Sequence, residues 1–120
     1  MGRVEEALRL ATAFVEAFNR HDVDAIGAML SEGCSFESAG PAPSGLRHEG
    51  CAATVRAIRG FFDAAPELSM QVEDAYGLGH HAVLRWRLTG IAGLPEGRRG
   101  VDLFTVRGGR IVEILAYAKG

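Results

Sequence analysis

The sequence has no long apolar run, no excess of basic residues and only two cysteines. Its apolar stretches are far shorter than the roughly 20 residues that a membrane-spanning helix needs. Lys and Arg number 13 against 15 Asp and Glu, and the net charge of −2 offers no basic surface for nucleic acid or an anionic membrane. The opening residues contain no apolar core of a secretory signal. These absences predict a cytoplasmic protein that binds neither nucleic acid nor membrane.

The cysteine and histidine content is too sparse for a metal centre. Cys34 and Cys51 are expected to be reduced and buried, because no secretory signal directs the chain to an oxidising compartment. His80 and His81 are consecutive at a predicted turn, so their side chains diverge. Nowhere do three or four ligating residues recur at the spacing of a metal site. We therefore expect neither a metal nor another cofactor.

The first half of the sequence has the periodicity of helices. With 48% hydrophobic residues, 120 residues are enough for one domain spanning 1–120 with its own core. Apolar residues at helical spacing predict a first helix over 4–18. Asp22 is a good N-cap for a short second helix that reaches Leu30, and a third helix begins near Gly50 and ends before Pro66.

The segment between the second and third helices, and the chain after the third helix, alternate as strands do. "GCSFES" reads as a first strand, followed by an irregular loop at 39–45. "YGLGHH" is predicted to be a turn, "GIAGLPEGRRG" a longer connection and "RGGR" a tight hairpin. Helices followed by a run of strands indicate an α+β fold, with three N-terminal helices packed on one face of a curved, mainly antiparallel sheet.

The segment "VDLFTVRGG" places a carboxylate on an apolar face. Alternation puts Asp102 on the same side as Phe104 and Val106. A charge on such a face costs several kcal/mol unless it is paired, hydrogen-bonded or neutralised by a raised pKa. Asp102 therefore either faces a cavity and acts as a general acid or base, or belongs to a structural network with the indole of Trp86 or a backbone amide.

The opposite face of the same strands is also apolar. Leu103, Leu115 and Tyr117 fall on the side away from Asp102. Three short helices cannot cover both faces of the sheet, so we expect the outer face to be buried against a second copy of the chain. The sequence thus predicts a homodimer through the sheet.

Three segments carry a resemblance to a known superfamily: "AFNRHDVDAIGAMLSEGCSFES", "RHEGCAATVRAIRGFF" and "GVDLFTVRGGRIVEI". Over its full length the chain resembles the cone-shaped nuclear transport factor 2-like superfamily, which includes ketosteroid isomerase and the SnoaL-type polyketide cyclases. The resemblance implies a cone-shaped fold whose sheet and helices enclose a hydrophobic pocket. It says less about function, since this fold is used by enzymes, ligand binders and adaptor proteins.

Ketosteroid isomerase gives the sharpest comparison of site residues. Its buried aspartate, which remains a neutral carboxylic acid at pH 7, matches Asp102. Its oxyanion-hole tyrosine matches Phe14, which lacks a hydroxyl, and its catalytic base matches Ser38, with Glu37 one place earlier. A one-residue shift would bring Glu37 inward but turn Phe36 outward. One of three functional positions is kept, so that mechanism is not supported. The SnoaL-like cyclases also use an acidic residue in the pocket, and "GLPEGRRGVDLF" is similar to their strand-loop-strand pattern.

The remaining candidates have structural alternatives. Ser38 is either a catalytic group or, more in keeping with the absence of a triad motif, a hydrogen-bonding wall or strand-end cap. His48 is either a second acid or base at the cavity rim or a solvated turn residue. Arg98 and Arg99 are either solvated loop charges or cations that bind an anionic group of the ligand at the entrance of the pocket. The expected substrate-contacting residues are Phe14, Phe18, Phe36, His48, Phe61, Met70, Trp86, Phe104 and Ile114.

Together these features predict a cofactor-free acid/base enzyme of the cyclase, isomerase or dehydratase type. Its substrate would be a small, hydrophobic, carbonyl-bearing molecule in an internal pocket, with Asp102 transferring a proton or donating a hydrogen bond. The alternative is a non-catalytic module of the same fold that binds a small ligand or another protein.

Overall fold

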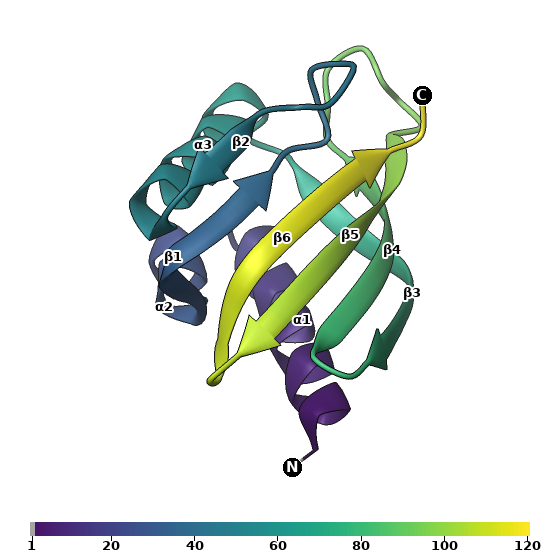
Figure 1. Cartoon of the computed structure of the whole chain (residues 1–120). Helices are drawn as coiled ribbons and strands as arrows, with labels where there is room; N and C mark the ends of the chain where they lie inside the picture. The colour runs from purple at the N-terminus through teal and green to yellow at the C-terminus, as the bar shows by residue number, and fades with distance from the viewer. Residues whose placement is uncertain (1) are drawn as a thin grey trace.

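The computed structural model describes residues 2–120, and its centre is a single curved sheet (Figure 1). The strand order is β2-β1-β6-β5-β4-β3. The strands are β1 (Leu30–Glu37), β2 (Arg47–Glu49), β3 (Ser69–Leu78), β4 (His81–Thr89), β5 (Arg98–Arg107) and β6 (Arg110–Ala118). Only β1 and β6 pair in parallel, and every other neighbouring pair is antiparallel. The predicted mainly antiparallel sheet is confirmed.

Three helices lie on one face of this sheet (Figure 1). They are α1 (Arg3–Asn19), α2 (Val23–Met29) and α3 (Cys51–Ala64). Helix α1 packs on β3, β4 and β5, whereas α3 packs on β1 and β2, with α2 between the two helices. The predicted α+β architecture is confirmed. Within residues 2–120, no helix combines the length and apolar character needed to cross a bilayer.

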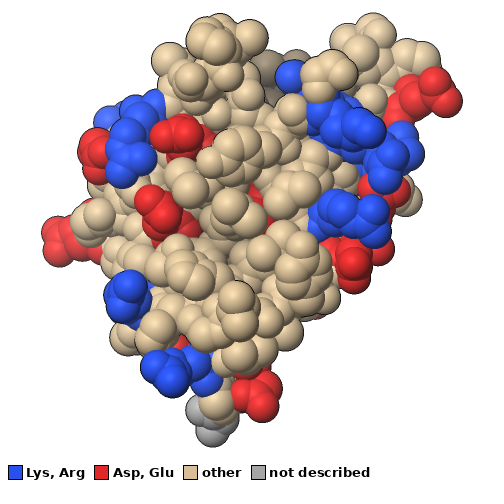
Figure 2. Space-filling model, turned by 45° about the vertical axis from the view of Figure 1, so that its right-hand side comes forward, with Lys and Arg blue, Asp and Glu red and all other residues tan. Residues whose placement is uncertain are grey.

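The face of the sheet opposite the helices carries its own apolar side chains. Cross-strand pairing aligns Tyr76, Val83, Leu103 and Leu115 in one row. Val101 and Tyr117 are paired in the next row. Figure 2 shows a largely uncharged area across the middle of this side of the molecule, with Lys, Arg, Asp and Glu gathered along its two margins. We refer to the six residues as the outer apolar patch.

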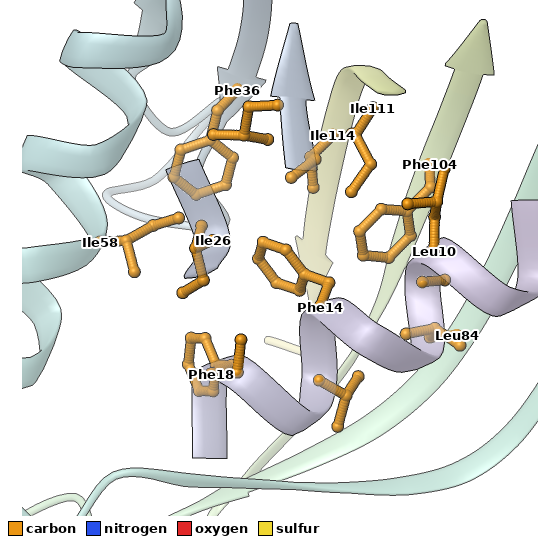
Figure 3. Close-up of a cluster of buried hydrophobic side chains, with 14 of the residues drawn as sticks. Leu10, Phe14, Phe18, Ile26, Phe36, Ile58, Leu84, Phe104, Ile111 and Ile114 are labelled. Carbon is orange, nitrogen blue, oxygen red and sulfur yellow. The ribbon is translucent and has the colours of Figure 1, made fainter. Parts of the chain in front are cut away.

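The main core lies between the helices and the inner face of the sheet. Phe14 of α1 points toward the sheet, where its ring meets that of Phe104 edge-on at 5.3 Å between centroids (Figure 3). Ile26, Ile58 and Ile114 are almost completely buried in the same cluster. Edge-to-face aromatic pairs add to the free energy gained by burial alone, so α1 is fixed firmly against β5.

Strand β1 begins at Leu30 rather than at the predicted Gly33, and two boundaries after α3 also differ from the structure. "YGLGHH" is mostly strand, because residues 76–78 pair with Val83, Ala82 and His81 and only residues 79–80 form the turn. Gly77 is accepted inside β3 because α1 packs closely there: a Cβ at Gly77 would lie 2.8 Å from Val4 Cγ1. Strand β5 begins at Arg98, so the connection before it is residues 90–97 and is shorter than predicted. Cross-strand pairing, which composition does not reveal, decides both boundaries.

Both cysteines are free thiols, as expected. Cys34 is buried, and its Sγ lies 3.7 Å from Thr54 Oγ1. Burial raises the pKa of the Cys34 thiol, so it has little thiolate character. Cys51 is half-buried, contrary to the predicted burial, because it lies at the first turn of α3, where its Sγ donates to Gly27 O at 3.6 Å.

The end of α1 is clamped to the start of β3 by two polar side chains. Asn19 Nδ2 donates to Met70 O at 2.9 Å, and Met70 N donates to Asn19 Oδ1 at 2.7 Å. His21, at a positive φ of 55°, donates through Nε2 to Leu68 O at 2.6 Å. The side chains of α1 and its following turn thus replace the missing neighbour of β3, the edge strand.

Replacing Asn19 by Ala should lower the free energy of unfolding by about 1–2 kcal/mol, because two hydrogen bonds to Met70 are lost together. Urea denaturation monitored by circular dichroism measures this change. The matched control is Glu16→Ala on the same helix, an exposed position expected to change stability by less than about 0.5 kcal/mol. Equal stability of the two variants would contradict the clamp.

Candidate functional site

A cavity of about 360 Å³ lies between α1, α3 and the inner face of the sheet. This volume is within the range of pockets that hold small molecules. The residues that line it are Phe14, Phe18, Phe36, Ser38, Ala39, Gly40, Ile58, Phe61, Ala64, Ala65, Leu68, Met70, Trp86, Leu88, Ile91, Arg98, Asp102, Ile114 and Ala116. Most of them are aliphatic or aromatic, so the cavity is an apolar space with a few polar groups.

Asp102 lies on the inner face of β5 and lines this cavity. Its neighbours across the sheet are Leu84 on β4 and Ala116 on β6, both apolar. The residue is 5% exposed, and within residues 2–120 its carboxyl group makes no ion pair and no side-chain hydrogen bond. The alternation argument from the sequence therefore placed this carboxyl on the correct face.

The surroundings of Asp102 change its acidity. Loss of hydration on burial raises the pKa of the Asp102 carboxyl from 3.8 to about 7. The indole N–H of Trp86 acts in the opposite direction and favours the ionised form. The indole N–H and the Asp102 carboxyl nevertheless form no hydrogen bond, and Trp86 Nε1 is buried without a partner among the described residues. Near neutral pH the carboxyl group is therefore present in both protonation states.

Trp86 reaches Asp102 because the residue beneath its ring is a glycine. Trp86 on β4 pairs with Gly100 on β5, two residues before Asp102 on the same face. A Cβ at Gly100 would collide with Cη2 of the Trp86 ring and with the carbonyl oxygen of Tyr117. The absent side chain lets the indole lie over β5 and form an apolar wall beside the carboxyl.

Ser38 lines the cavity, but its hydroxyl group is occupied. Ser38 Oγ donates to Gly40 O at 2.8 Å and accepts from Leu46 N at 3.1 Å, which closes the loop between β1 and β2. This is the bonding of a strand-end cap, and within residues 2–120 no carboxylate or imidazole group is hydrogen-bonded to the hydroxyl. Glu37 does not line the cavity; its carboxylate lies 3.6 Å from Arg47. The choice between Glu37 and Ser38 that the sequence left open is thus decided for Ser38.

Seven of the nine predicted substrate-contacting residues line the cavity. They are Phe14, Phe18, Phe36, Phe61, Met70, Trp86 and Ile114. His48 does not; its ring stacks on Phe36 at 5.5 Å from outside the cavity lining. Phe104 is fully buried and packs against Phe14 in the core below. Alternation placed Phe104 on the right face but could not show how far along β5 the cavity extends.

The lining also includes residues outside the nine predicted contacts, among them Arg98, which the sequence offered as a charge at the entrance. Leu88, Ile91 and the α3 residues Ile58, Ala64 and Ala65 complete the apolar wall, and Arg98 adds a cation. Helical spacing and strand alternation could have indicated Ile58 and Leu88 as inward-facing. Within residues 2–120, no three or more His, Cys, Asp or Glu residues gather as they would around a metal ion.

Comparison with known proteins identifies the family. Residues 11–114 match the profile of the SnoaL-like domain. The chain belongs to the SnoaL-like domain family. No curated protein sequence matches it. The resemblance noted in the sequence is thus confirmed at the level of the family.

Solved structures agree with this assignment. A nuclear transport factor 2-like protein of unknown function from Mesorhizobium loti is 32% identical, covers 100% of this chain and 96% of its own, and superposes with a TM-score of 0.87. Two more distant structures share the fold alone. A candidate ketosteroid isomerase from Kribbella flavida is 19% identical (100% and 82% covered, TM-score 0.85), and an M. tuberculosis epoxide hydrolase of the LEH-like type is 21% identical (99% and 82%, TM-score 0.81).

The raised pKa of Asp102 predicts how stability depends on pH. Between pH 4 and pH 7 the folded SnoaL-like chain holds a proton that the unfolded chain releases, so stability falls as pH rises through this window. The shift corresponds to a loss of about 4 kcal/mol from this one group above pH 7. Asp102→Asn should remove that dependence and be more stable than the native chain at pH 8.

Carbon-13 NMR of the carboxyl groups and urea denaturation across pH measure the two quantities directly. The matched control is Asp63→Asn, which removes an exposed carboxylate near the end of α3 and should leave the pH dependence intact. An Asp102 titration with a midpoint near 4 would show that the carboxyl is hydrated in solution.

Proposed function

We propose that this SnoaL-like chain is an enzyme that needs no cofactor and transfers a proton beside the carbonyl group of a small hydrophobic substrate. The observation that supports this most directly is the Asp102 carboxyl inside an apolar cavity, unpaired among the described residues. A buried acid whose pKa of about 7 lies near the working pH is suited to proton transfer.

Asp102 has one role in each protonation state. As a neutral acid it donates a hydrogen bond to the substrate carbonyl oxygen and stabilises the negative charge that develops there. As a carboxylate it removes the proton from the carbon beside the carbonyl, which leaves an enolate, and returns that proton at the same or another carbon. These steps conserve electrons and give exchange or isomerisation. In a cyclase the enolate carbon would instead attack a second carbonyl group, whose oxygen takes the proton from Asp102. In a dehydratase the enolate would expel a hydroxyl group, which takes that proton and leaves as water. Trp86 and Phe14 offer flat apolar walls for the substrate body.

The cavity lacks two groups that a ketosteroid isomerase uses. Phe14 carries no hydroxyl, and the Ser38 hydroxyl is held by Gly40 and Leu46. Asp102 would therefore act without a second acid or base on these two positions. Ser38 shapes the wall and the adjoining loop, and we assign it no part in the proton transfer.

A panel of neutral cyclic and aryl ketones in deuterium oxide tests the proposal without assuming the final product. The native chain should accelerate hydrogen–deuterium exchange at the carbon beside the carbonyl, as measured by proton NMR. Asp102→Asn should lower the exchange rate at least about 100-fold, the usual contribution of a positioned acid or base, while ligand affinity changes little.

Asp63→Asn serves as the matched control and should exchange at the native rate. The emission of Trp86, the only tryptophan, reports ligand binding in each variant. Ketones that bind without any exchange above the buffer rate would reject the enzyme and favour a small-ligand-binding module. The pH profile separates the two roles: activity that rises through pH 7 indicates the base, and activity that falls indicates the acid.

The outer apolar patch supports a second proposal, that two copies associate through this face of the sheet. Its residues come from β3, β4, β5 and β6 and lie in adjacent rows, with Tyr76 and Tyr117 more than half exposed. A twofold axis would place the patch against itself and remove these side chains from water.

Replacing Leu103 at the centre of the patch by Arg should therefore weaken the dimer, because a buried, unpaired charge is costly. Sedimentation equilibrium should give twice the chain mass of 12.8 kDa for the native protein and the single-chain mass for Leu103→Arg. Arg59→Ala, an exposed change on α3, should leave the native mass unchanged. A native protein that sediments as a single chain at micromolar concentration would reject this proposal.

A further inference from the structure

We propose that Arg98 binds an anionic group of the molecule in the cavity, so that the substrate is a hydrophobic carbonyl compound with a carboxylate at its far end. This inference rests on the proposed function of the cavity and specifies its substrate class. It starts from the side chains that can form polar contacts with a ligand. Ser38, Arg98 and Asp102 are the lining residues with polar side-chain oxygen or nitrogen atoms apart from the indole of Trp86.

Two of these four groups are not free for a ligand. The Ser38 hydroxyl group already bonds to Gly40 and Leu46, and Trp86 Nε1 is enclosed by protein atoms. The remaining two groups are the carboxyl of Asp102 and the guanidinium of Arg98. A ligand that matches the cavity therefore has two polar ends, each facing one of these side chains.

The strand geometry sets these two groups apart along one face. Because successive side chains of a strand point to opposite sides, Arg98, Gly100 and Asp102 lie on the same side of β5, with Asp102 buried and Arg98 exposed at the start of the strand. Four residues of extended strand separate the Cα atoms of Arg98 and Asp102 by about 13 Å. The Trp86 ring lies over Gly100 between them and forms an apolar wall. The site thus has an acid at its inner end, a flat apolar middle and a cation at its solvent-exposed end.

Arg98 also differs from the arginines beside it. Arg99 Nε lies 3.0 Å from Glu73 Oε1, Arg87 lies 4.0 Å from the same carboxylate, and Arg85 lies 3.8 Å from Asp74. The three arginines on the outer face of β4 and β5 are thus each paired with one of two carboxylates. Among residues 2–120, Arg98 has no ion pair and no side-chain hydrogen bond, although it lines an otherwise apolar wall.

The chemistry of the guanidinium group indicates the kind of anion. Its planar N–H groups match the two oxygens of a carboxylate, and charge-assisted bonds of this kind are stronger than neutral ones. The position is exposed at the cavity opening, so the anionic end of the ligand can stay partly hydrated while its apolar body enters. A carboxylate therefore adds affinity without being buried.

The test uses two probes of the same shape and different charge, para-acetylphenylbutanoate and its primary amide. Calorimetry measures the Kd of each probe for the native chain, Arg98→Gln, Arg98→Lys and Arg99→Gln. The native chain should bind the carboxylate about tenfold more tightly than the amide. Arg98→Gln should remove this preference by weakening the carboxylate alone, and Arg98→Lys should restore part of it. Arg99→Gln is the matched control, on the outer face, and should keep the native preference.

The affinities of the four chains for the two probes show whether this inference or the proposed function fails. Equal native affinity for the two probes, or a preference that survives Arg98→Gln, overturns anion recognition by Arg98 and leaves proton transfer at Asp102 intact. A preference lost in both Arg98→Gln and Arg99→Gln also overturns it, since surface charge then explains the effect. Binding of neither probe counts against both proposals. A preference for the carboxylate that is lost only in Arg98→Gln supports anion recognition by Arg98, whether or not the chain catalyses exchange.

Discussion

The loss of hydration around the Asp102 carboxyl is the constraint on which the site depends. Asp102 lies between Leu84 and Ala116 on the neighbouring strands and makes no hydrogen bond among the described residues. Ionising this carboxyl group therefore costs free energy, and its pKa rises to about 7. Natural chains tolerate such a cost where the group has a task, and the aromatic cavity beside it is the place where that task would be carried out. The proposed role of Asp102 as an acid or base would account for the stability that its burial costs.

The architecture makes that position possible by holding the helices apart. Helix α1 covers β3 to β5 and α3 covers β1 and β2, so the inner face is lined but not filled between them. Two glycines adjust the fit: Gly77 lets α1 approach β3, and Gly100 lets Trp86 lie over β5. The same sheet that carries the carboxyl inward carries the outer apolar patch on its other side.

Membership of the SnoaL-like family fixes the fold more firmly than the chemistry. Proteins described as an isomerase and as an epoxide hydrolase share this architecture at about one-fifth identity, so the frame itself is compatible with different reactions. In this chain the polar lining side chains free for a ligand are one acid deep in the cavity and one cation at its opening, and the proposed proton transfer on an amphipathic molecule rests on these two groups.

The sequence by itself determined the α+β order, the curved sheet, the inward direction of Asp102 and most of the aromatic wall, because these follow from local periodicity of 3.6 and 2 residues. The boundaries of β3 and β5 needed the pairing between strands. The occupied hydroxyl of Ser38, the outward turn of Glu37 toward Arg47 and the place of His48 outside the cavity depend on contacts between segments far apart in the chain. That Arg98 lines the cavity also depends on such contacts. Only the tertiary structure decides which inward-facing residues share one empty space, since that depends on how far each helix lies from the sheet.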